Sequence, residues 1–174
     1  MRHRWWMVLV VALQIAILLV MVGMKWSTLT YGTKVLLETR QVDPYDVFRG
    51  DYLTLSLDIG RLDLNKVEHQ DQEFKQNETV YVSLQPDGRY WTARAVSRDQ
   101  PSDRSVFIKG RVIYYLSGDP YLNVDYGIDS YYIPQGQGYR VDWQTPLEAE
   151  VSVDRWGGSA LSRLLIGGQA LEFE

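Results

Sequence analysis

The sequence predicts a mostly β protein, with a single N-terminal transmembrane helix followed by an antiparallel β-barrel or β-sandwich domain of about eight short strands. Two observations lead to this prediction. An apolar run fills residues 5–24, with Gln14 as its only strongly polar member. From residue 33 onward, apolar and polar residues alternate with period two in short segments, and turn-forming residues separate these segments.

The apolar run is long enough to cross a bilayer, because 20 helical residues rise roughly 30 Å. Arg2 and Arg4 precede it and favour a cytoplasmic N-terminus, and tryptophans flank it at both ends. The alternative is a cleaved signal peptide, whose apolar region usually has about 7–15 residues and ends at a small-x-small site. The following "KWSTLTYGTK" offers no such site. The sequence therefore favours an uncleaved signal-anchor.

These features divide the chain into four parts. We predict a cytoplasmic tail at 1–4, a transmembrane signal-anchor helix at 5–24, a juxtamembrane linker at 25–32 and an extracytoplasmic β-rich domain at 33–174. The predicted location is the cell inner (cytoplasmic) membrane, crossed once, with the N-terminus in the cytoplasm and the C-terminal domain outside. The first expected partner is the lipid bilayer, which residues 5–24 would contact.

Charge and cysteine content exclude several functions for the outer part. Two of the 18 Lys and Arg residues lie in the tail, so the outer part contains 16 of them and all 22 Asp and Glu residues, which gives it a net charge of −6. This acidic balance argues against a nucleic-acid partner, which usually requires a basic face. The chain has no cysteine, so disulfides, thiol nucleophiles and cysteine-based metal sites are excluded.

Seven segments are the clearest strand candidates. In order they are "LTLSLDI", "TVYVSL", "RYWTARAV", "SVFIKGRVIYYL", "YLNVDYGI", "LEAEVSV" and "QALEFE". Asp87-Gly88 between the second and third predicts a β-hairpin. Gly110, inside the fourth, indicates a bulge or a close backbone approach. Residues 61–78 break the pattern because they are polar and charged, and they predict one short helix or a mobile excursion.

The stretch "DPYDVFRGDYLTL", residues 43–55, is the most unusual part of the sequence. Asp43 and Pro44 favour a turn, because proline fixes φ and aspartate accepts hydrogen bonds from turn N–H groups. Gly50 permits a positive φ, and Asp51 is placed to accept backbone N–H groups or to pair with Arg49. This interpretation makes the stretch the structured start of a strand.

A functional interpretation of the same stretch is also open, as a partner-binding surface or as an acidic site built from Asp43, Asp46 and Asp51. Calcium requires six to eight oxygen ligands, and this spacing matches no EF-hand-like loop. Paired carboxylates divide acid and base roles only where a pocket separates their pKa values. We therefore favour the structural role, and we predict no catalytic residue, metal ligand or cofactor.

Within this stretch, "FRGDYLTLSLDI", preceded by "VDPYD", resembles the signature of the bacterial GDYXXLXY protein family. The match covers Gly50, Asp51, Tyr52 and Leu55, whereas Leu57 replaces the final tyrosine. The resemblance implies a short membrane-anchored protein with one span and a β-rich outer domain, which in a bacterium would be periplasmic. Such proteins tend to be encoded beside multi-pass membrane proteins. The family has no assigned activity and supplies no catalytic residues.

Aromatic residues are concentrated between residues 114 and 143. Aromatic side chains are common on half-buried strands, so packing in the core is one interpretation. An amphipathic binding surface is the other, because Tyr and Trp are enriched at interfaces. The candidate partner-binding residues are Tyr131, Tyr132, Tyr139 and Trp143.

Known hydrolase patterns fit the sequence poorly. Ser27 and Lys109 are the nearest approach to a signal-peptidase dyad, but the expected Ser-x-Met-Pro-like stretch is missing. His3 and His69 are the only histidines, too few and too poorly placed for a triad or a zinc site. We expect a non-enzymatic accessory protein that associates with an integral-membrane protein. The alternative is an envelope glycan, peptide or small-ligand binding module, or a weak hydrolase using the aspartates described above.

Overall fold

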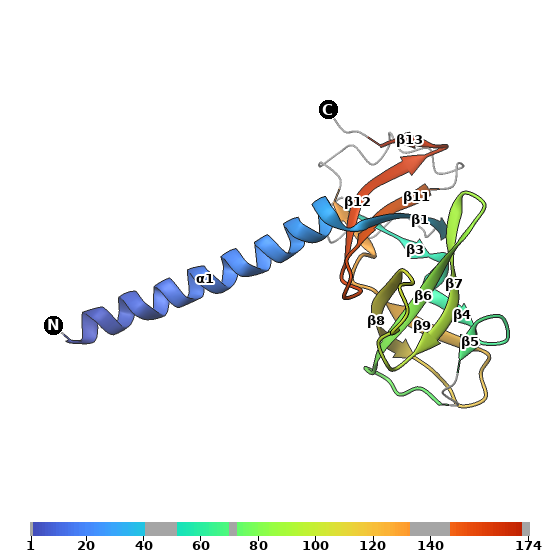
Figure 1. Cartoon of the computed structure of the whole chain (residues 1–174), viewed down its shortest axis with the longest axis horizontal. Coiled ribbons are helices and arrows are strands. Elements are labelled where there is room, and N and C mark those ends of the chain that lie inside the picture. The colour runs from blue at the N-terminus through green and yellow to red at the C-terminus, as the bar shows by residue number, and fades with distance from the viewer. Residues whose placement is uncertain (1, 41–51, 70–72, 133–146, 172–174) are drawn as a thin grey trace.

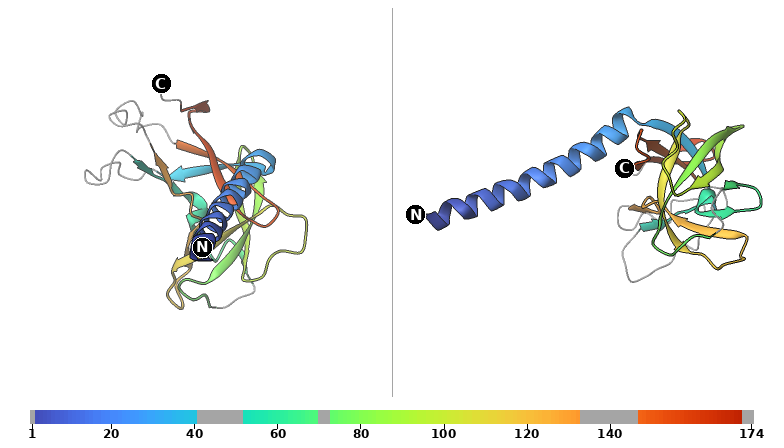
Figure 2. Two further views of the ribbon diagram at one scale, coloured as in Figure 1. Left: turned by 90° about the vertical axis from the view of Figure 1, so that its left-hand side faces the viewer. Right: turned by 60° about the horizontal axis from the view of Figure 1, so that its bottom comes forward.

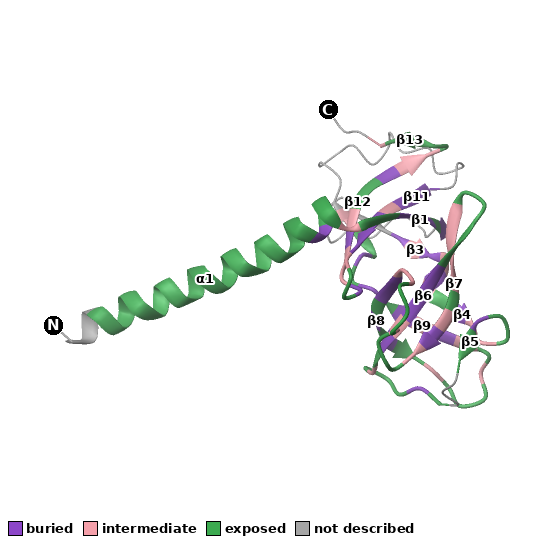
Figure 3. Ribbon diagram, in the orientation of Figure 1, coloured by how far each residue is buried: buried purple, intermediate pink, exposed green. Residues whose placement is uncertain are grey.

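The structure, a computed structural model, describes residues 2–40, 52–69, 73–132 and 147–171. A long helix, α1 (Arg2–Tyr31), projects from one end of a β-rich domain (Figure 1). The right-hand view of Figure 2 again shows α1 extending away from the domain. Every residue of α1 from position 5 to position 27 is exposed (Figure 3). An apolar helix exposed on all sides is suited to lipid rather than to water.

Thirteen short strands and one 3₁₀ helix, η1, follow α1 in the described residues. Their bounds are β1 Thr33–Arg40, β2 Tyr52–Thr54, β3 Ser56–Leu57, η1 Asp58–Gly60, β4 Arg61–Asp63, β5 Glu68–His69, β6 Thr79–Asp87, β7 Tyr90–Ser97, β8 Phe107–Tyr114, β9 Tyr121–Asp125, β10 Ser130–Tyr132, β11 Leu147–Val153, β12 Ser159–Ile166 and β13 Gln169–Ala170.

The strands form two main sheets. The first, which we call the anchor sheet, has the order β13-β12-β11-β1-β3 and follows directly on α1. The second, the outer sheet, has the order β4-β9-β8-β6-β7-β5, and a small ribbon pairs β10 with β2. All pairs are antiparallel except β5 with β7. Neither main sheet closes on itself among the described strands.

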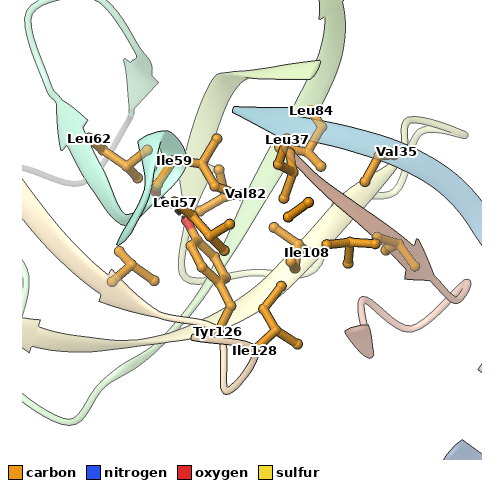
Figure 4. Packing of buried hydrophobic residues seen from close by; sticks show 14 of the residues in the cluster. Val35, Leu37, Leu57, Ile59, Leu62, Val82, Leu84, Ile108, Tyr126 and Ile128 are labelled. Atoms are coloured by element: carbon orange, nitrogen blue, oxygen red, sulfur yellow. Dashed lines mark hydrogen bonds between the residues drawn. The ribbon is translucent and has the colours of Figure 1, made fainter. Parts of the chain in front are cut away.

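One hydrophobic core is shared by both sheets (Figure 4). Val35 and Leu37 enter it from β1, and Val80 and Val82 enter it from β6, all with no exposed surface. In each strand the buried positions are two residues apart, as a pleated strand with one buried face requires. Tyr126 also lies in the core, and burial raises the pKa of its phenol, which donates a hydrogen bond of 2.8 Å to the carbonyl of Ile59.

Several sequence predictions are confirmed. The fold is mostly β with one N-terminal apolar helix, and β6 and β7 form the expected hairpin, with Gly88 at a φ of +60°. Gly110 of β8 is a position of close approach: an added Cβ would lie 2.3 Å from a methyl carbon of Val124. By contrast, segment 25–32 was predicted to be a linker outside the helix, and the structure corrects this because α1 continues to Tyr31.

Other predictions need correction. The described residues contain thirteen strands rather than about eight, and two open sheets rather than a closed barrel. "LTLSLDI" is not one strand, because the chain leaves β2 for β3 and then forms η1. Within 61–78, the described residues form β4, a turn and β5 and contain no α-helix. Here pairing of β4 with β9 and of β5 with β7 outweighs the polar composition.

Candidate functional site

The most distinctive feature of the described residues is the connection between α1 and the β domain. The helix ends at Tyr31 and β1 starts at Thr33, so Gly32 alone separates them. The Gly32 N–H donates to the Thr28 carbonyl at 2.9 Å. A Cβ at Gly32 would lie 2.4 Å from that same oxygen and 3.0 Å from the carbonyl oxygen of Val153. Glycine therefore permits the chain to pass between the helix end and β11.

Polar side chains fasten the last turns of α1 to the anchor sheet. The Thr28 hydroxyl is 6% exposed and donates to a carboxylate oxygen of Asp154 at 2.8 Å. The Lys25 ammonium donates to the carbonyl of Ser159 at 2.6 Å, and the Ser152 hydroxyl donates to the carbonyl of Leu29 at 3.4 Å. We call these contacts the junction. They hold the helix and the domain in one fixed arrangement.

The turn between β11 and β12, residues 154–158, provides the rigid side of the junction. The second carboxylate oxygen of Asp154 accepts the N–H groups of Trp156 and Gly158, each at 2.9 Å. Gly157 has a φ of +81°, and its carbonyl accepts the N–H of Lys109 in β8 at 2.8 Å. The turn is therefore tied to the helix on one side and to the outer sheet on the other.

An open groove of about 630 Å³ lies beside the junction. Its walls come from the end of α1, from residues 103–107 and from the β11–β12 turn. Trp156 is 58% exposed, and the Arg155 guanidinium lies 4.1 Å from the centre of its ring. Tyr31, on the helix side, is 84% exposed. We call this feature the junction groove.

Farther from the helix, a buried carboxylate joins the two sheets. Glu148 of β11 is 3% exposed. It accepts hydrogen bonds of 2.7 Å from both the Arg89 guanidinium and the Tyr90 hydroxyl, which lie at the start of β7. The hydrogen bond to this carboxylate raises the pKa of the Tyr90 phenol. All three groups have partners, so the cluster serves as a clamp between the sheets.

A second ionic cluster crosses three strands of the anchor sheet. The Glu150 carboxylate lies between Lys34 at 3.2 Å and Arg163 at 2.8 Å. Desolvation acts to raise the pKa of Glu150, but the hydrogen bonds and charges of Arg163 and Lys34 outweigh it and lower the pKa below its ordinary value of 4.5. The cluster stabilises the folded state above that pH.

Glu150→Gln is expected to lower the melting temperature at neutral pH, by the equivalent of about 1 kcal/mol or less per ion pair. Because the folded-state pKa is depressed, this stabilisation is complete above 4.5 and disappears as the pH falls through the lower folded-state value. The wild type should therefore lose more stability on acidification than the variant. Thermal melts across this pH range measure the difference, with Glu68→Gln at an exposed position as the control. Parallel pH profiles for wild type and Glu150→Gln would contradict the assignment.

The family model for the GDYXXLXY protein matches residues 14–164 of this chain. The chain belongs to the GDYXXLXY family. No curated protein and no solved structure matches it. The matched range begins within α1 and ends in β12, so it includes the junction as well as both sheets. The family model therefore covers part of the helix and most of the domain.

The first two residues of the GDYXXLXY motif, and the acidic segment before it, lie outside the described residues. This applies to Asp43, Pro44, Asp46, Arg49, Gly50 and Asp51. Tyr52 starts β2, where its backbone pairs with Tyr132 of β10. Leu55 is buried, and its N–H donates to the carbonyl of Asp129 at 2.6 Å. The described part of the motif thus contributes to the core and to the β2–β10 ribbon, and the role of its aspartates stays a prediction.

The candidate partner-binding aromatics of this GDYXXLXY protein are only partly described. Tyr131 of β10 is half-buried and packs against the core. Tyr139 and Trp143 lie outside the described residues, as does the side chain of Tyr132. Elsewhere in the aromatic stretch, Tyr126 is a core residue whereas Tyr114 is exposed. Their role as a binding surface stays a prediction.

The residues considered for hydrolysis are not brought together. Ser27 lines the junction groove, Lys109 lies in β8, and no hydrogen bond joins their side chains. The His69 Nδ1–H donates to the carbonyl of Val67 at 3.0 Å. In the described part of the chain, no group of three or more His, Asp or Glu side chains is arranged to hold a metal ion.

A second open groove of about 480 Å³ lies next to the described end of the family motif. Leu55, Leu57 and Ile113 supply apolar surface, and Arg61 and Asp125 supply charge at its rim. The Asp125 carboxylate is occupied locally, because it accepts the Gly127 N–H at 2.7 Å. The groove is a shallow amphipathic surface on the outer sheet.

Proposed function

We propose that the protein is a non-enzymatic accessory protein, anchored in the cytoplasmic membrane, whose β domain is held outside the cell's inner membrane against an integral-membrane partner. The observation that supports this most strongly is the junction. A domain that needed only to be tethered would tolerate a flexible linker, whereas Thr28, Gly32 and Asp154 fix its orientation relative to α1. Fixed orientation is useful to a protein that must present one face to a neighbour in the same membrane.

The proposed topology is supported by the composition and exposure of α1. The helix is apolar enough to cross a membrane, and its residues 5–27 are all exposed in the structure. Arg2 and Arg4 would keep its start in the cytoplasm, and the net charge of the remaining chain agrees with an external domain. We further propose that the anchor and outer sheets pack face to face as a β-sandwich over their shared core.

The first prediction concerns this topology. A reporter fused after Glu174 should be active only outside the cytoplasm, and the full chain should resist extraction from membranes by alkaline carbonate. The mature protein should retain residues 1–24, which N-terminal mass spectrometry can detect. Recovery of a mature N-terminus near residue 28 or 30, or activity of a cytoplasmic reporter at the same fusion point, would contradict the anchor.

The second prediction concerns the partner. A photo-crosslinking amino acid placed at exposed positions of α1, such as Val11, Leu18 and Val22, should form adducts with a multi-pass membrane protein from one face of the helix. Inserting six Gly and Ser residues between Met24 and Lys25 should reduce these adducts strongly, because the flexible insert lets the domain turn independently of the span. The junction itself is left intact by this insertion.

A matched control uses the same insert in the turn after Asn65, between β4 and β5, where the residues are exposed. That variant should retain wild-type crosslinking. Equal crosslinking with the insert after Met24 would show that fixed orientation is unnecessary, and adducts restricted to lipid at every α1 position would show that no protein partner contacts the span.

A binding module for an envelope glycan, a peptide or another small ligand is the second candidate function. It is supported by the groove on the outer sheet, where apolar side chains and charged rim residues lie together as they do in ligand sites. The two functions are separable by mutation. Arg61→Ala and Ile113→Ser should abolish ligand binding in this groove but leave crosslinking from α1 intact.

A further inference from the structure

We infer that the junction groove binds the phosphate headgroup of an anionic membrane lipid from the leaflet next to the domain. This inference rests on the proposed function, because it requires α1 to cross the bilayer. Three independent properties of the groove point to the same ligand: its depth relative to the membrane, its charge, and the pairing of apolar with hydrogen-bonding walls.

The depth follows from the contacts between α1 and the β11–β12 turn. About 20 residues fill the hydrocarbon core, so the apolar run Trp5–Met24 accounts for it and Lys25 is the first charged residue beyond it. Lys25 contacts Ser159 and Thr28 contacts Asp154, which places the turn beside helix residues 25–28. Four residues rise about 6 Å. The lipid headgroup layer on each side is roughly 5–8 Å thick, so the turn lies within it.

The exposed side chains at this level are those expected at a membrane surface. Trp156 projects from the turn beside Arg155, and Trp26 and Tyr31 are exposed on the neighbouring helix. Tryptophan and tyrosine rings favour the headgroup layer, since one part of the ring is apolar and the other forms hydrogen bonds. In a domain far from the membrane, the apolar parts of these rings would be exposed to water.

Two guanidinium groups that line the groove are free to bind an anion. Arg104 and Arg155 line it, and neither forms an ion pair with another residue of the described chain. The two aspartates of the groove are occupied by internal contacts: Asp154 as described above, and Asp103 by the Ser105 hydroxyl at 2.5 Å and by Arg94 at 3.3 Å. A guanidinium binds phosphate oxygens through two parallel hydrogen bonds, so an anionic phosphate is the fitting ligand.

The walls of the groove distinguish a lipid from a free anion. Val106 and Phe107 supply an apolar wall, and the hydroxyls of Ser27 and Tyr31 lie on the helix side. An inorganic phosphate would use only the arginines. A phospholipid would also place its glycerol near the hydroxyls and the first part of its acyl chains along the apolar wall. The groove starts at the membrane-spanning helix, so a lipid reaches it without leaving the bilayer.

The test uses the full chain in neutral detergent micelles and follows the indole N–H resonance of Trp156, assigned with Trp156→Phe. Three probes are titrated: dihexanoyl phosphatidylglycerol, dihexanoyl phosphatidylcholine and inorganic phosphate. We expect the phosphatidylglycerol to shift this resonance saturably, and the other two probes to bind at least fivefold more weakly. Arg104→Gln and Arg155→Gln should each weaken the binding of phosphatidylglycerol by about fivefold, which is the effect of one basic side chain near anionic lipid.

Arg111→Gln is the matched control, because Arg111 is an exposed arginine of β8 that does not line the junction groove. It should bind as the wild type does. Equal affinity for both lipids, or unchanged affinity in both arginine variants, would overturn the inference. Equal affinity for inorganic phosphate would also overturn it, in favour of a free-anion site.

The titration and the topology experiment fail in different ways. Loss of carbonate resistance or a cleaved anchor would contradict the proposed function, whereas loss of headgroup selectivity in micelles would contradict the lipid site and leave the proposed function standing. The two arginines come from different segments, residues 103–107 and the β11–β12 turn, so misfolding of one variant, detected by its remaining indole resonances, leaves the other to decide the result.

Discussion

Gly110→Val is expected to destabilise the domain by about 3 kcal/mol, the upper part of the range for overpacking a well-filled core. Gly110 lies in β8 opposite Val80 of β6, in the middle of the outer sheet. A Cβ there would lie 2.3 Å from a Val124 methyl carbon and 2.9 Å from two ring carbons of Tyr126. The ring is held by its hydrogen bond to Ile59, so moving it away sacrifices a buried interaction.

For a domain of this size, such a loss corresponds to roughly 6–12 °C in melting temperature. Gly60→Ala is the matched control, because the nearest atom to its added Cβ is the Val124 carbonyl oxygen at 3.7 Å, an ordinary contact. Differential scanning calorimetry of the full chain in detergent should show a large drop for Gly110→Val and little change for Gly60→Ala. A Gly110→Val melting temperature within two degrees of wild type would show that Tyr126 does not fill the space over β8.

Glu148→Ala is expected to cost about 2–3 kcal/mol, because it removes the acceptor of two hydrogen bonds, one of them from a charged guanidinium. Glu148 also lies directly opposite Glu38 of β1, a like-charge pair that is unfavourable unless a cation is close. Arg89 supplies that cation. Glu148→Gln keeps the volume and one acceptor oxygen, so it should cost less than the alanine variant.

A double-mutant cycle isolates the clamp from other effects of these substitutions. Tyr90→Phe and Glu148→Gln should show a coupling free energy of at least 0.5 kcal/mol, as expected for residues in one hydrogen-bond network. Denaturant melts of the four proteins provide the values. Strict additivity would mean that the contact between Tyr90 and Glu148 contributes nothing to the association of the two sheets.

The sequence predicts best those features that local pattern determines. The span follows from a continuous apolar run, and the β6–β7 hairpin follows from Val80 and Val82 on one face and from Asp87-Gly88 at the turn. The same alternation in "TKVLLETR" buries Val35 and Leu37, so its period also indicates a strand, although β1 is not among the seven strand candidates.

Features formed by residues far apart in the chain could not be predicted. Thr28 and Asp154 are 126 residues apart, and Tyr90 and Glu148 are 58 apart. Nothing near Glu148 in the sequence reveals that its carboxylate is buried, because its partners Arg89 and Tyr90 are far away in the chain. Gly32 is a partial exception: a lone glycine at the end of a long helix often marks its termination, and this signal was available.

Sequence alternation also did not predict where strands are interrupted. "LTLSLDI" has perfect alternation, yet pairing of Leu57 with Thr39 of β1 and of Thr54 with Ser130 of β10 divides it between two partners. A register shift between Glu150 and Val151 similarly disturbs the pattern of β12 against β11. Period alone gives the buried face of a strand but not the partner to which each residue is bonded.

Only Gly32 separates α1 from β1, so the helix and the domain move together. A rotation of the helix about its axis inside the bilayer therefore turns the domain through the same angle. Each helical residue corresponds to about 100° of rotation, and a change of one residue between Met24 and Gly32 would turn the domain's partner-facing side by more than a right angle. The length of this short segment therefore sets the direction in which the β domain faces on the membrane surface. A neighbouring protein that rotates or tilts α1 would change the orientation of the β domain directly.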